Sequence, residues 1–281
     1  MEQRMKFSVS MCVYGGDNTD WFETAVNSVV NQTLVPDEIV LVVDGPVGKE
    51  LDSVICYFEK NSLFKVIRIP ENLGHGNARR IGLKNCSNEL VALMDADDIS
   101  VLDRFEKQVC FFENNSDVSI VGGNISEFIE DPKKPVGYRV VPQSDIEIKK
   151  YLKKRCPFNQ MTVMFKKSDV DKAGGYLDWF CNEDYYLWLR MYLERLKFAN
   201  LGTVLVNVRV GKEMYKRRGG KKYFISEYNL QKYMLKKKII SFDVFVINVL
   251  KRFVVQILLP SELRSFVFQK FGRKKTNEKK I

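Results

Sequence analysis

The 281-residue sequence predicts an α/β fold, in which a mainly parallel sheet carries helices on both faces and a basic helical extension follows at the end. Over the first 120 residues, short apolar runs alternate with segments of helical periodicity, a pattern typical of parallel strands joined by helices. Charge is distributed unevenly. Residues 211–281 carry 19 Lys and Arg against 5 Asp and Glu, a net charge of +14, whereas residues 1–210 carry a net charge of −4.

The elements of the first half follow one another in a regular order. Strands are predicted over residues 7–13, 37–44, 65–69 and 91–94, with helices over 20–30 and 51–61. A glycine-rich loop at 72–82 leads into a third helix, and a fourth is predicted to begin near Ser100 or Asp103. Because right-handed crossovers bring the carboxyl ends of parallel strands to one edge of the sheet, the residues that follow these strands should converge.

In the second half, the predicted strands and helices alternate less regularly. Strands are predicted over 118–121, 161–165 and 204–210, helices over 146–154 and 183–194, and a loop over 132–142. We place the end of the main domain at residue 222 and the basic, amphipathic helical extension over residues 223–281.

Three carboxylates, Asp95, Asp97 and Asp98, follow directly after the apolar run at residues 90–94. Open α/β sheets bind their ligands at the carboxyl ends of the strands. Like charges this close repel one another unless a cation lies among them, and Mg²⁺ or Mn²⁺ binds one or two carboxylates together with phosphate oxygens of a substrate. The alternative is an Asp-rich turn in solvent that caps the following helix.

Asp44 and Arg79 are candidates for binding a nucleotide. Asp44 ends the second strand, where an acid can accept hydrogen bonds from a base or a ribose, or can form the turn that follows. Arg79 comes after Gly74 and Gly76 at a predicted helix N-terminus, and this combination favours an anion such as a phosphate. A solvated arginine on a helix is the alternative.

An acidic pair, Glu183 and Asp184, opens the late helix. The helix macrodipole favours acids there regardless of function, but one of them could also act as general base on an acceptor hydroxyl. Trp179 and Phe180 lie just before the pair. Aromatic rings beside carboxylates suit a sugar and suit a protein core equally well.

Taken in order, these motifs resemble family 2 glycosyltransferases of the GT-A fold, whose sheet is of the Rossmann type. The resemblance covers about residues 5–225 and is closest to bacterial members that build exopolysaccharide, capsule and O-antigen repeat units. It rests on residues 7–14, the strand that ends at Asp44, 72–82, 94–98 and 182–190, with further similarity at 156–167 and 215–220. Two positions depart from the family pattern: Val43 stands where many members have Asp, and Arg80 stands where Asn is usual.

The resemblance implies a role for each motif. Residues 1–120 would form the nucleotide-binding half and residues 121–222 the acceptor-binding half. The implied contacts of the nucleotide sugar are Tyr14, Asp44, Arg79, Asp95, Asp97, Arg217 and Arg218. The other implied roles are metal ligands at Asp97 and Asp98, a catalytic base at Asp184 beside Glu183, and acceptor contacts at Trp179, Phe180 and Gln160.

The implied reaction moves a sugar, with inversion, from a nucleotide-diphosphate sugar to a hydroxyl of a lipid-linked polysaccharide repeat unit, with UDP as the expected nucleotide. Bound Mn²⁺ or Mg²⁺ would neutralise the leaving diphosphate, and Asp184 would take the proton of the attacking hydroxyl. Arg217 and Arg218 would form a basic lid over the diphosphate; the alternative is a surface charge run.

The basic tail predicts contact with an anionic surface, and we expect the inner membrane rather than nucleic acid. Residues 242–259 are apolar enough to suggest a membrane span, but Lys251 and Arg252 fall at its middle, where charge is costly. We therefore expect a helix in the membrane surface, or else one packed on the body. The first residues lack a signal-peptide core and the six cysteines form no C-x-x-C pair, which predicts buried free thiols and a cytoplasmic protein, peripheral on the cytoplasmic face of the membrane.

Two other functions remain open from the sequence. A nucleotidyltransferase that makes sugar nucleotides also uses carboxylate-bound Mg²⁺, but it favours a basic glycine-rich loop after the first strand, and residues 14–17 contain no Lys or Arg. A non-enzymatic protein that binds anionic surfaces would explain the tail, but it leaves the acidic strand end and the Glu183–Asp184 pair without a function.

Overall fold

A computed structural model describes residues 4–211, 219–260, 263–264 and 273. The strands are β1 (Phe7–Tyr14), β2 (Glu38–Asp44), β3 (Phe64–Ile69), β4 (Leu90–Met94), β5 (Ile99–Ser100), β6 (Val118–Phe128), β7 (Gly137–Arg139), β8 (Met164–Lys166) and β9 (Lys197–Arg209). The helices are α1 (Thr19–Val30), α2 (Lys49–Glu59), α3 (His75–Asn85), α4 (Arg104–Asn114), α5 (Asp145–Leu152), α6 (Lys167–Lys172), α7 (Glu183–Leu193), α9 (Lys221–Lys236) and α10 (Phe242–Phe253). A 3₁₀ turn at Gln160–Thr162 and a π-helical turn at Val254–Leu258 complete the described elements.

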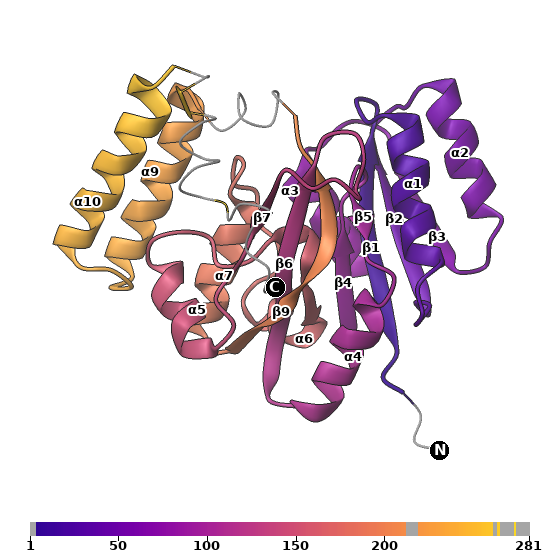
Figure 1. The fold of residues 1–281 in the computed structure, drawn as a ribbon, viewed down its shortest axis with the longest axis horizontal. Helices are drawn as coiled ribbons and strands as arrows, with labels where there is room; N and C mark the ends of the chain where they lie inside the picture. The colour runs from indigo at the N-terminus through magenta and orange to yellow at the C-terminus, as the bar shows by residue number, and fades with distance from the viewer. Residues whose placement is uncertain (1–3, 212–218, 261–262, 265–272, 274–281) are drawn as a thin grey trace.

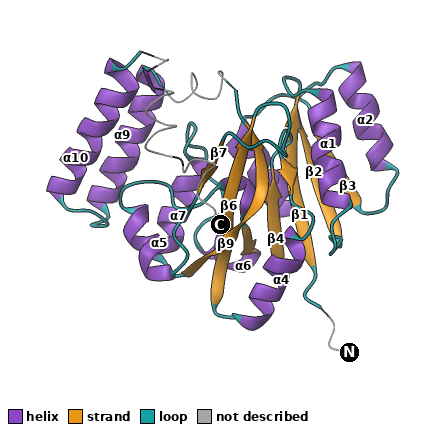
Figure 2. Ribbon diagram, in the orientation of Figure 1, coloured by secondary structure: helices purple, strands orange, loops and turns teal. Residues whose placement is uncertain are grey.

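The strands form one sheet in the order β3-β2-β1-β4-β8-β6-β9-β5, and β7 pairs with β6 outside that path. The four strands of the first half are parallel, as predicted, with Tyr14 opposite Asp44 and Met11 opposite Met94. Their carboxyl ends therefore lie at one edge. The predicted α/β class is confirmed, and Figure 2 shows the sheet at the centre of the molecule with helices around it.

Two apolar cores cover the two faces of this sheet. Alternate residues of β4 point to opposite sides, so Ala92 belongs to one core and Val91 to the other. The first core contains residues of α1, α2 and α4, and the second contains residues of α3, α5, α6, α7 and α9. The sheet is thus buried on both faces, which explains the continuous apolar runs of its first strands.

The second half of the sheet is mixed. β8 runs antiparallel to both β4 and β6, whereas β6 and β9 are parallel. Two predicted strands were too short: that at 118–121 extends to Phe128, and that at 204–210 begins at Lys197. The predicted strand at 161–165 divides into the 3₁₀ turn and β8, and the predicted loop at 132–142 contains β7.

Buried polar residues explain why β6 was predicted too short. Asn124, Ser126 and Glu127 are all less than 5% exposed, and they find partners inside the fold. Asn124 receives the backbone N–H of Val141, and the Ser126 hydroxyl bonds to Asn207. A strand with polar side chains on both faces has neither the alternation nor the apolar run by which strands are recognised.

The C-terminal helices pack on the main body. Leu230 and Met234 of α9 are fully buried in the same core as Trp188 of α7. Figure 1 shows α9 and α10 side by side, at the opposite end of the molecule from α1 and α2. Among the described residues, no helix combines the length and the apolar character needed to span a bilayer.

α10 is unusual for a surface helix, because polar groups lie on its inward side and apolar side chains lie on its outward side. Its inward side combines polar groups with Val244 and Phe245, which pack against the core. Asn248 is buried and donates to the Lys153 carbonyl and to Gln231, and Arg252 pairs with Glu227 of α9. Its outward side is apolar, with Ile247 49% and Leu250 57% exposed. The extension is therefore packed on the body and still presents an apolar face to its surroundings.

The prediction of buried free thiols is right in one part and wrong in another. All six cysteines are free, but only Cys86 is buried, while Cys56, Cys110 and Cys181 are exposed. Cys56 and Cys110 lie on helices and Cys181 lines the cavity described below, and an isolated sequence position gives no sign of such an orientation.

Candidate active site

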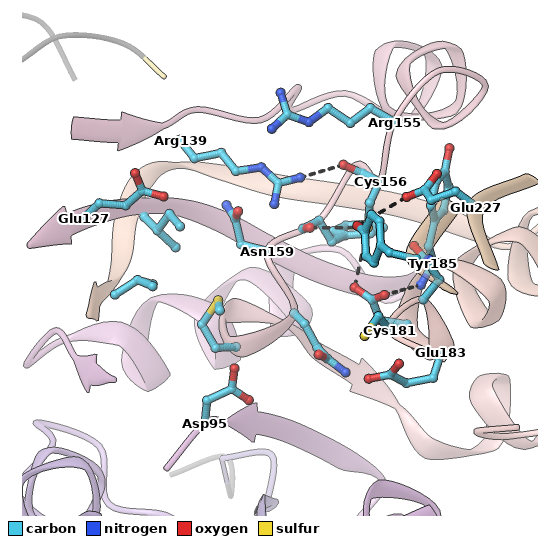
Figure 3. A pocket seen from close by; sticks show the side chains of 18 of the residues that line it. Asp95, Glu127, Arg139, Arg155, Cys156, Asn159, Cys181, Glu183, Tyr185 and Glu227 are labelled. Atoms are coloured by element: carbon cyan, nitrogen blue, oxygen red, sulfur yellow. Dashed lines mark hydrogen bonds between the residues drawn. The ribbon is translucent and has the colours of Figure 1, made fainter. Parts of the chain in front are cut away.

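A cavity of about 620 Å³ brings together the acids after β4, the N-terminus of α7 and the two C-terminal helices (Figure 3). Asp95, Asp97 and Asp98 lie on its wall with Glu183 and Asp184, as the convergence of strand ends predicts. Side chains from much later in the chain, including Tyr223 and Gln256, complete the lining. The extension is thus part of the cavity and not an appendage to it.

Asp98 is the most deeply buried of the three acids, at 2% exposure. One of its carboxylate oxygens accepts the backbone N–H of Arg209 at 2.9 Å. Burial raises its pKa well above the usual range, and the charges of Asp97 and Asp95 raise it further. Three acids that oppose one another's ionisation form a site that needs positive charge.

Arg79 ties the strand ends together beneath this cluster. Its side chain is 1% exposed and donates to the Ser10 carbonyl within β1, to the Met94 carbonyl at the end of β4, and to the Asp95 carboxylate. The helix that carries it begins after Gly74. Arg79 therefore fixes Asp95 relative to the sheet.

Asp44 holds the loop that leads into α3. Its two carboxylate oxygens accept the backbone N–H groups of Leu73 at 2.8 Å and Gly74 at 3.1 Å. Gly45 makes this approach possible, since its φ is +87° and a Cβ there would lie 2.7 Å from the Asn72 nitrogen. Asp44 is 4% exposed, so the structure gives it a clear role in shaping the loop.

The donor set of the three acids fits Mg²⁺ or Mn²⁺. All their ligand atoms would be carboxylate oxygens, which these hard cations prefer, and burial together with the charges of Asp97 and Asp95 raises the pKa of Asp98. The described residues hold no group of three or more His, Cys, Asp or Glu with the geometry of a protein-only metal site. Two carboxylates with phosphate oxygens from a substrate would suffice.

Asp184 lies in the first turn of α7 and accepts the Tyr185 backbone N–H at 2.6 Å. The thiol of Cys156 lies 3.6 Å from its other oxygen. Burial, and then the charge of Glu183, raise the pKa of Asp184 to about 6. A carboxylate with this pKa is a stronger base than an ordinary aspartate and is still ionised at neutral pH.

Glu183 is connected to Arg79 through the single histidine. His75 Nδ1 lies 2.7 Å from Glu183 Oε1, and Arg79 Nε donates to His75 Nε2 at 3.3 Å. Because Nε2 accepts a hydrogen bond, Nδ1 carries the proton and donates it to Glu183. A continuous chain of contacts thus joins the acidic pair of α7 to Asp95.

Comparison with known proteins assigns the family. The model of the family described as "Glycosyl transferase family 2" matches residues 8–171, more than half of the chain. This protein belongs to glycosyl transferase family 2. A glycosyltransferase of Haemophilus influenzae without assigned function is 42% identical over 270 residues, covering 96% of this chain and all of its relative.

Two further similarities describe the glycosyltransferase more closely. The UDP-Gal:alpha-D-GlcNAc-diphosphoundecaprenol beta-1,3-galactosyltransferase of Escherichia coli is 37% identical over 269 residues, 96% of this chain and 97% of that protein. The structure of S. aureus TarS 1-349 in complex with UDP-GlcNAc has a TM-score of 0.65 at 16% identity, covering 95% of this chain and 76% of that one. The fold similarity confirms the predicted GT-A architecture, and the family argues against the nucleotidyltransferase and the non-enzymatic alternatives.

Of the remaining predicted substrate contacts of the glycosyltransferase, some line the cavity and others lie elsewhere. Gln160 lines the cavity, and its amide nitrogen is buried without a partner among the described residues. Trp179 and Phe180 lie instead at the junction with α9: Trp179 donates to the Ser226 carbonyl, and Phe180 lies under the Lys222 ammonium. Tyr14, 45% exposed, lies at the end of β1. Their predicted contacts with substrate stay predictions, and Arg217 and Arg218 lie outside the described residues.

The sequence reasoning missed two arginines beside the acids. Arg104 is fully buried under the end of β4 and donates to the Leu93 carbonyl; burial lowers its pKa to about 9, whereas the charge of Asp95 opposes this shift. Arg209 lies over the rings of Trp21 and Phe128 and donates its backbone N–H to Asp98. A lone arginine in a helix or strand gives no sign of burial, because arginines are usually exposed.

The raised pKa of Asp184 predicts an acid limb in the pH profile of the enzyme. Only the ionised carboxylate can accept a proton, so kcat/KM should fall about tenfold for each pH unit below about 6. Rates measured between about pH 5 and 8 with a fixed concentration of nucleotide sugar would show this limb. A profile that stays level down to pH 5 would contradict the assignment of Asp184 as base.

Proposed function

We propose that this glycosyltransferase moves a sugar from a UDP-sugar to a hydroxyl group of a lipid-linked saccharide diphosphate, with inversion at the anomeric carbon. The observation that carries the proposal is the cavity itself: Asp184, with its pKa near 6, lies in the same cavity as the acids that would meet the donor diphosphate. The E. coli relative, which is similar over nearly its full length, is named for a UDP-sugar donor and a diphosphoundecaprenol acceptor.

In the proposed mechanism, Asp184 removes the proton of the acceptor hydroxyl as the oxygen attacks the anomeric carbon. Glu183 supports this step, because its charge raises the basicity of Asp184. Arg79 holds Asp95 in place, so the acids keep one arrangement while the donor diphosphate departs. Mn²⁺ or Mg²⁺ held by Asp97 and Asp98 would neutralise the charge of the leaving diphosphate.

Inversion follows from a single base on the side opposite the leaving group. Retention by double displacement needs a nucleophilic carboxylate next to the anomeric carbon, whereas direct attack by the acceptor needs only the base. Of the two acids at the start of α7, Glu183 is engaged with His75 and Asp184 is the one with the raised pKa. We therefore assign proton removal to Asp184 alone.

Product analysis tests the proposal. The full-length enzyme is incubated with Mn²⁺, a panel of UDP-sugars and a saccharide-diphosphate-alkyl acceptor, and the anomeric configuration of the product is read from its NMR coupling constants. We expect a product with the configuration opposite to that of the donor. A product of the same configuration would contradict the mechanism, and activity with GDP- or dTDP-sugars alone would contradict the proposed donor.

We also propose that the outward face of α10 docks on the cytoplasmic face of the inner membrane. The face is apolar and exposed, and its neighbour, the turn between α9 and α10, carries Lys236, Lys237 and Lys238, all exposed. Apolar side chains bordered by lysines suit a surface of anionic lipid. A lipid-linked acceptor would remain in the membrane while its saccharide enters the cavity.

Vesicle sedimentation tests the docking surface. Ile247→Glu with Leu250→Glu places two charges on the exposed face and should abolish sedimentation with vesicles that contain anionic lipid. Tyr57→Glu is the matched control, since Tyr57 is 66% exposed on α2, at the other end of the molecule. Equal sedimentation of both variants, or none by the wild type, would overturn the docking proposal.

A further inference from the structure

The charged side chains that line the cavity separate into an acidic group and a basic group. Its acids after β4 and at the start of α7 lie on one side, whereas Figure 3 shows Arg139 and Arg155 on the other side, with Cys156 and Asn159 between them. Lys154 and Lys251 belong to the lining as well, and both are exposed. The proposed reaction uses the acidic side and gives the basic side no substrate.

The arginines on the basic side exceed the acids that could neutralise them. Arg273 pairs with Glu127 at 2.5 Å, and both side chains are buried. The guanidinium of Arg155 makes no hydrogen bond or ion pair with any of the described residues, and Arg139 has no acid partner among them. Positive charge therefore accumulates there without compensation from the protein.

The neighbouring positive charges affect the pKa of Arg139, and its hydrogen bonding is incomplete. Burial, and then the charges of Arg155 and Arg273, lower its pKa to about 10. One of its terminal nitrogens donates to the Cys156 carbonyl at 2.8 Å, but its Nε is buried and has no acceptor among the described residues. A buried N–H without an acceptor costs free energy that a bound anion would recover.

We propose that Arg139 and Arg155 form the subsite that binds the diphosphate of the lipid-linked acceptor. This assignment rests on the proposed function. Guanidinium groups bind phosphate oxygens through paired hydrogen bonds, and two of them match the charge of a diphosphate better than one. Val255 and Gln256, which follow α10, line the same cavity as the two arginines.

The subsite also sets the length of the acceptor. Cys156 touches both ends of the acceptor site, because its carbonyl accepts from Arg139 and its thiol lies 3.6 Å from Asp184. One residue therefore separates the diphosphate subsite from the catalytic base. We expect a single sugar ring to join the two, with a hydroxyl at Asp184 and the anomeric phosphate at the arginines.

A buried amide supports the place of this sugar ring. Asn159 is 1% exposed and lies between the two sides in Figure 3. Its nitrogen donates to the Gly123 carbonyl at 2.8 Å, which leaves its oxygen buried without a donor among the described residues. A sugar hydroxyl would supply that donor. The enzyme is thus expected to extend a lipid-diphosphate monosaccharide.

Calorimetry with three probes tests the subsite. The probes are a GlcNAc-diphosphoryl-alkyl chain, the matched alkyl GlcNAc without phosphate, and UDP with Mn²⁺. We expect wild type to prefer the diphosphate over the neutral glycoside, and Arg155→Gln to reduce this preference about tenfold to hundredfold, the worth of one charge-assisted hydrogen bond. Arg139→Lys, which retains the charge but loses the planar fork, should reduce it less than Arg139→Gln does.

The neutral glycoside and UDP distinguish failure of the subsite from failure of the proposed function. Affinity for the neutral glycoside and for UDP should be unchanged in Arg155→Gln, and Arg68→Gln on β3, at the far edge of the sheet, should change nothing. If the arginine variants weaken UDP instead, the subsite serves the donor diphosphate and the proposal fails. If wild type binds UDP but shows no preference for the diphosphate probe, the subsite fails while the proposed function stands; if it binds no UDP, the proposed function fails as well.

Discussion

Replacing Asp184 with Asn should lower kcat by about 10²–10⁴-fold, because the acceptor hydroxyl loses the group that takes its proton. The KM for the nucleotide sugar should hardly change, since the proposed partner of Asp184 is the acceptor. Steady-state transfer rates at about pH 7.5 measure both quantities. Asp178→Asn is the matched control, because this exposed acid lies a few residues before the pair and outside the cavity.

The same substitution should make the protein more stable at neutral pH. The pKa of Asp184 is about 6 in the folded state, against 3.8 for an ordinary aspartate, so the folded protein loses stability as the pH rises through this interval. Asn removes this cost, about 1–3 kcal/mol above pH 6. A denaturation midpoint that falls at pH 7.5 would contradict the burial and the charge of Asp184.

Replacing Asp98 with Asn should abolish the metal dependence of UDP binding. Asn keeps the size of the side chain and the acceptor for the Arg209 N–H, so the fold should persist, but it removes a charge from the proposed cation site. We expect a loss of about 10²–10⁴-fold in kcat/KM, and a similar loss when wild type is treated with a chelator. Titration of UDP with and without Mn²⁺ measures the coupling.

The control for Asp98 lies a short distance along the chain. Asp103 is adjacent to the first residue of α4, its side chain is 44% exposed, and it pairs with Lys107 outside the cavity. Asp103→Asn should leave UDP binding and its metal dependence intact. UDP affinity that is independent of Mn²⁺ in wild type would contradict the role of a cation here.

The first half of the molecule was predictable because its chemistry is local. β2 and β4 are short apolar runs followed by acids, so the sequence alone is enough to assign Asp44 and Asp95 to one sheet edge. The acids of α7 were also recognisable, since a pair of carboxylates at a helix start is visible in the sequence itself. These features depend on few long-range contacts.

The basic side of the cavity could not be predicted for the opposite reason. Glu127 and Arg273 pair across 146 residues of sequence, and Arg139 comes from a segment that was expected to be a loop. Which face of α10 turns towards the body could not be predicted from the sequence either. Its periodicity shows one apolar face and one polar face, but only packing against Lys153 and Gln231 decides that the polar face turns inward.

The two-sided character of α10 has a kinetic consequence. If the apolar side rests on lipid while the polar side borders the cavity, the enzyme meets its acceptor by diffusion in two dimensions and its donor by diffusion in three. The rate would then depend on the mole fraction of acceptor among the membrane lipids, and diluting the bilayer with inert lipid would slow transfer at a constant bulk acceptor concentration. The surface density of acceptor in the membrane, and not its bulk concentration, would then set the transfer rate.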